Sequence, residues 1–317
     1  MPSLLQAFDE LPVSKNTAQG LSVFRAVPVV ANGPVLLAKT ALGDACLLVR
    51  TVSASGGLPP PMRLENLKVQ HSLTGKVHVQ QGIEEGAFTL ITLGSNDPAL
   101  VAVFLRFAQV LTQQLPSRPK ASEVATQIQG LVELLQNLRQ PSTKTIQGLW
   151  AELLVMDTRL DPESWISAWH VDPMGLHDFI LGESRVEVKS SSGQVRQHRF
   201  SHNQLNAPVG SSLSIASVLV ERSGQGLSVF DLSERLHSRL TVSASFVLDN
   251  TISATLGLDF QKAREIRFDQ DSARASLLFF PLGVVPRLNE EVSDRISDIA
   301  YSVRLLDSDG QQDPVFA

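Results

Sequence analysis

The chain has 317 residues, of which 43% are hydrophobic and 19% charged, a composition typical of a globular protein with one or two domains. Its single cysteine, Cys46, excludes an intramolecular disulfide and a cysteine-rich zinc site. The N-terminal segment lacks the pattern of a signal peptide, and no apolar run approaches the roughly 20 residues that a membrane span requires, so we expect a cytoplasmic protein. The formal net charge of −5 excludes a uniformly basic surface of the kind that many nucleic-acid-binding proteins carry.

The first 140 residues are predicted to form a β-rich region that ends in two helices. Asn96-Asp97-Pro98 is a helix-start signal, so a helix is expected over 99–115. A second helix is expected from Ser122 to Leu138, because its apolar residues keep helical spacing up to Pro141. Before these helices, strands are expected in the apolar runs 21–30, 34–40, 45–52 and 88–94, which Gly, Pro, Asn and Ser residues separate.

Residues 141–225 are predicted to form an α/β core, reached through a linker at 139–144. Its expected elements are a helix over about 145–157, an irregular Trp-containing stretch over 162–177, and strands over 177–181, 184–191 and 213–221. Glu152 lies at the margin of the apolar side of the helix. Residues 226–317 alternate helical and strand-like runs, and we expect them to form an α/β region that packs on the core.

The hexapeptide QGLSVF occurs twice, at 19–24 and at 225–230. The residues that flank the two copies do not match. We therefore interpret the copies as two similar strands rather than as a sign of domain duplication.

Asp178, Glu187 and Lys189 form the candidate chemical site. If 184–191 is a strand, Glu187 and Lys189 point to the same face, and an Asp at the end of the preceding strand, across a tight turn, can lie beside them. Two carboxylates that converge on one point are stable together when a cation lies between them, and Mg²⁺ is the hard ion that such a pair favours. A metal ion, two carboxylates and a lysine beside them are the groups that phosphodiester hydrolysis requires.

The motif alone has little specificity. With 15 glutamates and 8 lysines in the chain, a Glu-x-Lys is expected by chance roughly 0.4 times, and an ion pair on a solvated strand would look the same. The chain nevertheless contains no nucleophile elbow, phosphate-binding loop or HExxH sequence that would offer a competing site.

Several stretches together resemble the PD-(D/E)xK nuclease superfamily. They are GLWAELLVM (148–156), HDFIL (177–181), VEVKSSS (186–192) and the residues from Arg196 to Leu205. They are most similar to a bacterial branch found in restriction and phage-defence loci. His177 stands where the family motif has proline, which ligates nothing. The resemblance covers residues 145–221 and implies a restriction-endonuclease-like α/β core with a mixed sheet, flanked by β-rich N- and C-terminal regions.

The resemblance also implies roles for individual residues. Asp178, Glu187, Lys189 and the helix residue Glu152 would be catalytic, and the metal ligands would be Asp178, Glu187 and the backbone carbonyl of Val188. Gln204 would be the polar residue of a following helix. The residues expected to contact DNA, with ordinary surface charge as the alternative for the arginines and a structural role for His198, are Ser190, Ser191, Arg196, His198, Arg199 and Gln204.

The activity that follows is a Mg²⁺-dependent endonuclease of double-stranded DNA, with Mn²⁺ as a substitute ion. Cutting both strands implies a homodimer or a larger defence complex, with a companion DNA methyltransferase as a further expected partner. The alternatives are a catalytically inactive DNA-binding or scaffold subunit and a repair or recombination nuclease.

Three local alternatives stay open from the sequence. His198 and His202, at i and i+4, are candidates for a metal clamp on a helix as well as for phosphate or structural contacts. Asp172-Pro173 competes with Asp178 for the Asp of the motif, although its segment lacks strand character. The three tryptophans, Trp150, Trp165 and Trp169, are expected to be core anchors rather than platforms for base stacking.

Overall fold

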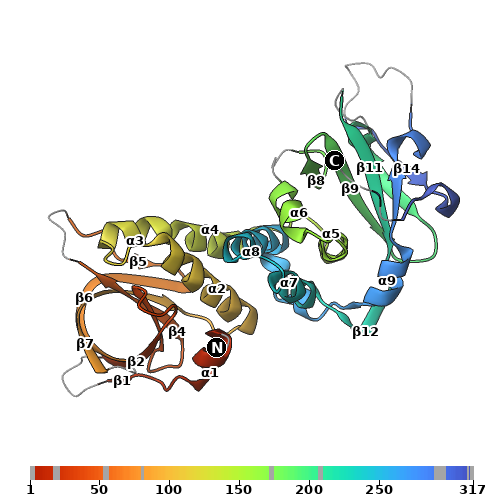
Figure 1. Cartoon of the computed structure of the whole chain (residues 1–317). Helices are drawn as coiled ribbons and strands as arrows, with labels where there is room; N and C mark the ends of the chain where they lie inside the picture. The colour runs from red at the N-terminus through yellow and green to blue at the C-terminus, as the bar shows by residue number, and fades with distance from the viewer. Residues whose placement is uncertain are drawn as a thin grey trace. The chain divides into compact units, whose positions relative to one another are not determined.

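The computed structural model describes residues 4–16, 22–52, 57–79, 82–170, 175–205, 210–288, 298–312 and 314. The chain forms two compact units, residues 1–139 and 140–317. Figure 1 shows that each unit contains its own sheet and helices. Among the described residues, no helix is both long and apolar enough to cross a membrane.

The first unit is a small barrel with helices beside it. Its strands follow the order β1-β2-β3-β4-β7-β6-β5, and β2 also pairs with β6, which closes a ring of five strands (Figure 1). Alternate residues of these strands point inward and form an apolar interior that includes Leu36, Leu48 and Phe88. Closing the sheet leaves the short strands β1 and β5 as its only edges among the described residues.

The bounds of the first unit agree with most expected elements. The helix over 99–115 corresponds to α2, whose N-cap Asp97 accepts hydrogen bonds from the backbone N–H groups of Ala99 and Leu100. The helix expected from Ser122 is instead two helices that meet at Ile128, and Gly130 in the first turn of the second weakens helical continuity there. The elements are α1 (Leu4–Glu10), β1 (Lys15–Asn16), β2 (Ser22–Pro28), β3 (Val35–Lys39), β4 (Ala45–Thr51), β5 (Met62–Arg63), β6 (Leu67–Val79), β7 (Gly82–Leu93), α2 (Pro98–Gln114), α3 (Ala121–Gln127) and α4 (Gln129–Asn137).

The second unit is built on a four-stranded mixed sheet of order β13-β11-β9-β8. Strand β9 is interior: it pairs parallel with β11 and antiparallel with β8. The elements are α5 (Ile146–Asp157), α6 (Pro162–Ala168), β8 (Phe179–Leu181), β9 (Ser184–Ser191), β10 (Gln197–Ser201), η1 (His202–Leu205), β11 (Ser212–Leu219), β12 (Arg222–Leu227), α7 (Val229–His237), α8 (Val242–Leu256), η2 (Gly257–Asp259), η3 (Lys262–Arg264), α9 (Gln270–Ser276), β13 (Leu278–Pro281), η4 (Leu282–Val284), β14 (Ala300–Arg304) and η5 (Asp307–Asp309).

Helix α5 is the central helix of this unit. It packs against β9 and α7, and every residue from Leu149 to Asp157 is buried. A helix that is apolar on nearly all sides is one that protein surrounds on nearly all sides. Trp150 is fully buried and donates from its indole to the carbonyl of Leu227 at 2.9 Å, as expected for a core anchor.

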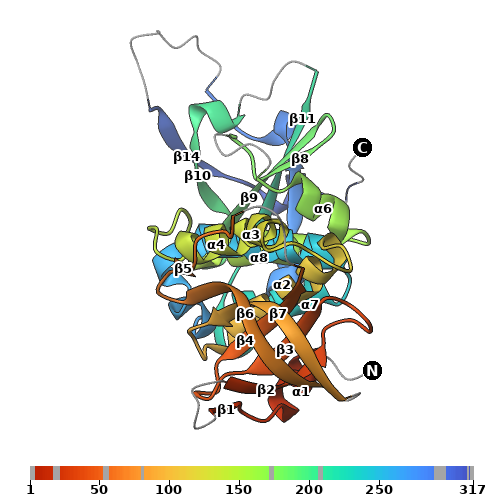
Figure 2. The ribbon, with the colours of Figure 1, turned by 90° about the vertical axis from the view of Figure 1, so that its left-hand side faces the viewer.

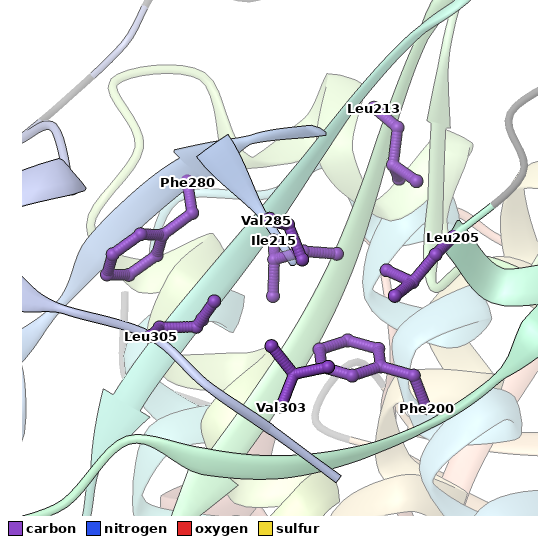
Figure 3. Packing of buried hydrophobic residues seen from close by; sticks show 8 residues of the cluster. All are labelled: Phe200, Leu205, Leu213, Ile215, Phe280, Val285, Val303 and Leu305. Carbon is purple, nitrogen blue, oxygen red and sulfur yellow. The ribbon is translucent and has the colours of Figure 1, made fainter. Parts of the chain in front are cut away.

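A second core lies between the sheet and an antiparallel ribbon formed by β10 and β14 (Figure 2). Figure 3 shows Leu213 and Ile215 of β11 pointing toward Phe200 of β10 and Val303 of β14. Strand β10 of the ribbon follows β9 in sequence, whereas β14 of the ribbon and β13 of the sheet belong to residues 226–317. Residues 226–317 therefore complete the sheet and the layer that covers one of its faces.

The expected mixed α/β class is confirmed, and two local expectations are wrong. Residues 162–168 of the Trp-containing stretch form helix α6, which Asp161 caps and Pro162 begins, a start signal that was present in the sequence. In the second copy of QGLSVF, residues 228–230 are not strand: Ser228 is the N-cap of α7 and the next two residues are helical.

Candidate active site

A tight hairpin places Asp178 beside the middle of strand β9. Strands β8 and β9 are joined by Gly182-Glu183, and Gly182 adopts a positive φ of 57°, which glycine tolerates without strain. Asp178 directly precedes β8, and its Oδ2 accepts a hydrogen bond of 2.7 Å from the backbone N–H of Val188. In an extended strand the N–H and C=O of one residue point the same way, so the Val188 carbonyl also faces the Asp178 side of β9.

Glu187 and Lys189 point to the face of the sheet that the β10–β14 ribbon covers. Glu187 lies opposite Ile215 of the parallel strand β11, and Ile215 belongs to the core beneath the ribbon. The Glu187 Oε1 atom lies 2.7 Å from the Lys189 Nζ atom. It also accepts a hydrogen bond of 2.7 Å from the Gln204 side chain on η1. The expected pairing of Glu187 and Lys189 on one face is thus present.

Glu152 is completely enclosed rather than solvated. It is 2% exposed and receives three contacts, each from a different residue. Lys144 Nζ lies 2.6 Å from Oε1, while Trp169 Nε1 and His170 Nε2 lie 2.7 and 3.0 Å from Oε2. A buried carboxylate needs such partners, because burying it alone would cost several kcal/mol.

The carboxylates of Glu152, Asp178 and Glu187 influence one another. Burial and the nearby Asp178 charge raise the pKa of Glu187 to about 8. Burial and the Glu152 charge raise the pKa of Asp178 above its ordinary value. Burial opposes ionisation of Glu152 as well, but its hydrogen bond with His170 and the charge of Lys144 outweigh burial and lower its pKa. Asp178 and Glu187 therefore resist ionisation unless a cation accompanies them.

Lys144 forms an ion pair with two carboxylates at once. Its Nζ contacts Glu152 and Asp178 Oδ1, and the Lys144 side chain is 29% exposed. Burial disfavours its charged form, but the two carboxylates outweigh burial and raise the pKa of Lys144.

Ligand atoms of Glu152, His170 and Asp178 lie within 4.8 Å of one another, a spacing that suits a bound metal ion. Asp178 belongs both to this group and to the ligand set expected from the sequence, which combines it with Glu187 and the Val188 carbonyl. Carboxylate and carbonyl oxygens are the donors that hard divalent cations prefer, so the residues fit such an ion.

A protein-family model described as "Putative PD-(D/E)XK family member (DUF4420)" matches residues 4–306. The chain belongs to this PD-(D/E)XK family. No curated protein and no solved structure matches the chain. The resemblance drawn from the sequence is confirmed at the level of the family, and the match extends through the barrel unit as well as the unit that carries the motif.

In this PD-(D/E)XK protein, the residues expected to contact DNA are not on one surface. Ser190 and Ser191 point to opposite faces of β9, since Ser190 accepts a hydrogen bond from Gln147 of α5 and Ser191 donates to the carbonyl of Val195. Arg199 is exposed on β10. Gln204 is on η1, a short 3-10 turn rather than a longer helix, and its amide is bound to Glu187.

Arg196 and His198 do not fit the expectation of phosphate contacts. The Arg196 side chain is 2% exposed, and it donates to Asp307 and to the carbonyls of Ser217 and Ser276. His198 is also buried, with its Nε2 2.7 Å from the Ser217 Oγ. Both side chains pack inside the unit because alternate residues over 196–200, from the position before β10 onward, turn toward the core.

The alternative in which His198 and His202 clamp a metal ion is also wrong, because the two residues do not lie on one helix. Residues 197–201 form a strand and His202 begins η1, so the two imidazoles do not have the i, i+4 geometry of a helix. The competing dipeptide Asp172-Pro173 lies outside the described residues.

Lys144 and His170 are the site residues that sequence reasoning missed. Lys144 lies in the segment expected to be a linker, and His170 follows Trp169 with a positive φ of 48°. Neither has a fixed spacing from the motif. The one available signal was the position of Lys144 directly before Thr145, the N-cap of the helix that carries Glu152.

Proposed function

We propose that the protein is a divalent-metal-dependent endonuclease that hydrolyses phosphodiester bonds of double-stranded DNA. The observation that supports this proposal is the position of three motif residues along β9: Asp178 accepts from the Val188 N–H, and Glu187, in the same stretch, lies 2.7 Å from Lys189. Burying a carboxylate destabilises a fold, so buried acids such as Glu187 need a reason to be present. Acids whose pKa values are shifted by burial and by one another are found preferentially at functional sites. The PD-(D/E)XK family, whose superfamily consists largely of nucleases, supports the same reading.

Asp178, Glu187 and the Val188 carbonyl would hold the metal ion, and Glu152 and His170, whose ligand atoms lie near those of Asp178, would be further candidate ligands. When bound, Mg²⁺ or Mn²⁺ would polarise the scissile phosphate and lower the pKa of a water molecule. The presence of three buried carboxylates, those of Glu152, Asp178 and Glu187, supports a divalent ion over a monovalent one.

The protein's own residues position the reactants. Lys189 lies 2.7 Å from Glu187, so it would orient the attacking water and offset the negative charge that develops on the phosphate. Gln204 would hold the Glu187 carboxylate in place through its 2.7 Å hydrogen bond. Removing the Lys189 or the Gln204 side chain would leave the Glu187 carboxylate free to rotate away from the reacting atoms.

The biological setting follows from the resemblance of residues 145–221 to restriction- and defence-associated nucleases. A restriction-modification or phage-defence system, a companion DNA methyltransferase and a cytoplasmic location belong to the proposal on that ground. Cleavage of both strands favours a homodimer or a larger complex, because one site cuts one strand at a time. Arg199 and Ser191 are the exposed or half-exposed residues that would meet the DNA backbone.

The test is cleavage of supercoiled plasmid DNA with Mg²⁺ or Mn²⁺ by the wild type and by Lys189→Ala and Asp178→Asn. We expect each variant to lose at least 100-fold in rate. Lys262→Ala, which removes an exposed lysine far along the chain from the motif, is the matched control. A Lys189→Ala protein that cuts as fast as the wild type would falsify the proposal.

A second candidate is a nuclease-like subunit that binds DNA or partner proteins without cutting. The ion pairs of Lys144 favour it, because a lysine already contacts two of the three acids. This candidate predicts no heat of Mn²⁺ binding and no cleavage with any added partner. A repair or recombination nuclease would keep the chemistry, and would cut branched or single-stranded DNA faster than linear duplex.

A further inference from the structure

Lys144 lies where a metal ion would have to compete with it. Its ammonium group contacts Asp178 Oδ1, an atom of the carboxylate that both candidate metal-ligand sets share, and it lies 2.6 Å from Glu152 Oε1. A divalent ion bound to Asp178 would face this positive charge at close range. The two cations would repel strongly in a site that is largely shielded from water.

The two acids that Lys144 contacts are also held in place by other groups. Glu152 also accepts from Trp169 and lies beside His170, while Asp178 accepts from the backbone of Val188. The two carboxylates would therefore keep their positions if the ammonium group moved away.

The backbone around Lys144 is fixed by hydrogen bonds, while its side chain is partly exposed. The Thr143 N–H donates to the carbonyl of Thr255, Ser142 donates to Asp259, and Thr145 caps α5. Gly257, with a φ of 46°, lets the end of α8 approach the carbonyl of Gln140, where a Cβ atom would collide with it. The lysine stem has four flexible carbons and is 29% exposed, so the ammonium group has a route to solvent.

We propose that Lys144 is a tethered counter-ion, which occupies the Glu152–Asp178 pair when no metal is bound and is displaced when a divalent ion enters. This inference rests on the proposed metal-dependent function. The lysine would stabilise the metal-free fold, because it prevents two buried acids from facing each other unpaired. It would also weaken metal affinity, since the ion must expel it.

The test is calorimetric titration of the full chain with Mn²⁺ after removal of bound metal by EDTA. We compare the wild type with Lys144→Met and Lys144→Gln, which remove the charge, and with Lys144→Arg, which keeps it. Lys76→Met, which removes an exposed lysine paired with Glu85, is the matched control. We expect at least tenfold tighter Mn²⁺ binding for the two neutral variants, and wild-type affinity for Lys144→Arg and Lys76→Met.

Thermal unfolding gives a second readout that does not depend on cleavage. In EDTA, Lys144→Met and Lys144→Gln should unfold at a lower temperature than the wild type, and Mn²⁺ should raise their unfolding temperatures by more than it raises that of the wild type. If a neutral variant does not fold without metal, refolding it with Mn²⁺ present supports the same conclusion.

Unchanged or weaker Mn²⁺ binding by both neutral variants would overturn the counter-ion role, because it would make Lys144 a bystander or an organiser of the ligands. The proposed function would survive that outcome if the wild type still bound Mn²⁺ and cut DNA. Absence of Mn²⁺ binding by every form, at millimolar concentrations, would overturn both.

Discussion

At the scale of single residues, Arg196 and Arg199 show that the alternation of side chains along an extended segment decides whether a charge is buried or exposed. Arg196 and Arg199 belong to one basic segment, but only Arg199 is exposed. Arg196 turns into the unit and donates to two backbone carbonyls as well as to Asp307. The count of basic residues in a segment therefore overstates how many can meet a phosphate.

We predict that Arg196→Met destabilises the fold by about 2–4 kcal/mol, because the buried carbonyls of Ser217 and Ser276 lose their donor. Arg199→Ala should change the free energy of unfolding by less than about 0.5 kcal/mol. It should also reduce the slope of the logarithm of the DNA-binding constant against the logarithm of the salt concentration by about one. Urea denaturation and DNA titrations at several salt concentrations measure the two effects. If Arg196→Met lowered the salt dependence of DNA binding while Arg199→Ala lowered stability, Arg196 rather than Arg199 would contact the DNA.

His198 should make stability depend on pH. Burial and the charges of Lys189 and Arg196 lower its pKa from 6.5 to about 4. Between these two pH values the unfolded chain binds a proton that the folded chain does not, so this residue's contribution to stability falls as the pH drops from 6.5 to 4.

The expected loss reaches about 3 kcal/mol at pH 4. His198→Gln should remove it, so the difference between wild type and variant should change across this pH window. Denaturant unfolding in EDTA at several pH values measures the difference, with His78→Gln at an exposed position as control. A pH-independent difference would contradict the prediction.

At the scale of elements, the triplet Ser-Val-Phe adopts two structures. Residues 22–24 lie in strand β2, whereas Ser228 caps helix α7 and the next two residues begin it. The following residue makes the difference: Asp231 completes a capping box with Ser228, and Arg25 at the corresponding place cannot accept such hydrogen bonds. Neighbouring residues thus override a shared sequence.

Ser228→Ala should therefore destabilise the fold by about 1 kcal/mol, because the N–H of Asp231 loses its acceptor at the start of α7. Thr126→Ala is the control, since its exposed hydroxyl lies inside a helix and donates to Ser122. Urea denaturation measures both. Equal stability of the two variants would mean that the capping box contributes nothing measurable.

At the scale of the whole molecule, the two units differ in charge. Residues 1–139 contain 11 Lys and Arg against 9 Asp and Glu, a net charge of +2, whereas residues 140–317 contain 16 against 23, a net charge of −7. All residues of the candidate site, from Lys144 to Gln204, lie in the second unit. We therefore expect the second unit to supply the metal ligands, and the positively charged first unit to add to the attraction for DNA.

We predict that residues 140–317, produced alone, fold and bind Mn²⁺ with a Kd within about threefold of the full chain, because every proposed ligand is present. Their affinity for DNA should be at least threefold lower at low salt, since the net charge of −7 repels phosphates, and the difference should shrink as salt is added. Calorimetry and DNA titration test the two parts. Loss of Mn²⁺ binding would show that the first unit contributes to the site.

The sequence by itself determined the features that depend on local rules. Strand alternation placed Glu187 and Lys189 on one face, helical periodicity placed Glu152 on α5, and cap and turn residues set most element boundaries. The mixed α/β class and the family followed from the same local patterns.

Only the tertiary structure decided which side chains surround the acids. Lys144 and His170 reach Glu152 from a connecting segment and from the end of α6, contacts that no sequence period encodes because they depend on chain packing. Packing also enclosed Glu152, which the margin of an amphipathic helix would leave in solvent, and turned Arg196 and His198 inward. Burial is a property of all the layers together, so it becomes known only when α5, the sheet and the β10–β14 ribbon are in place.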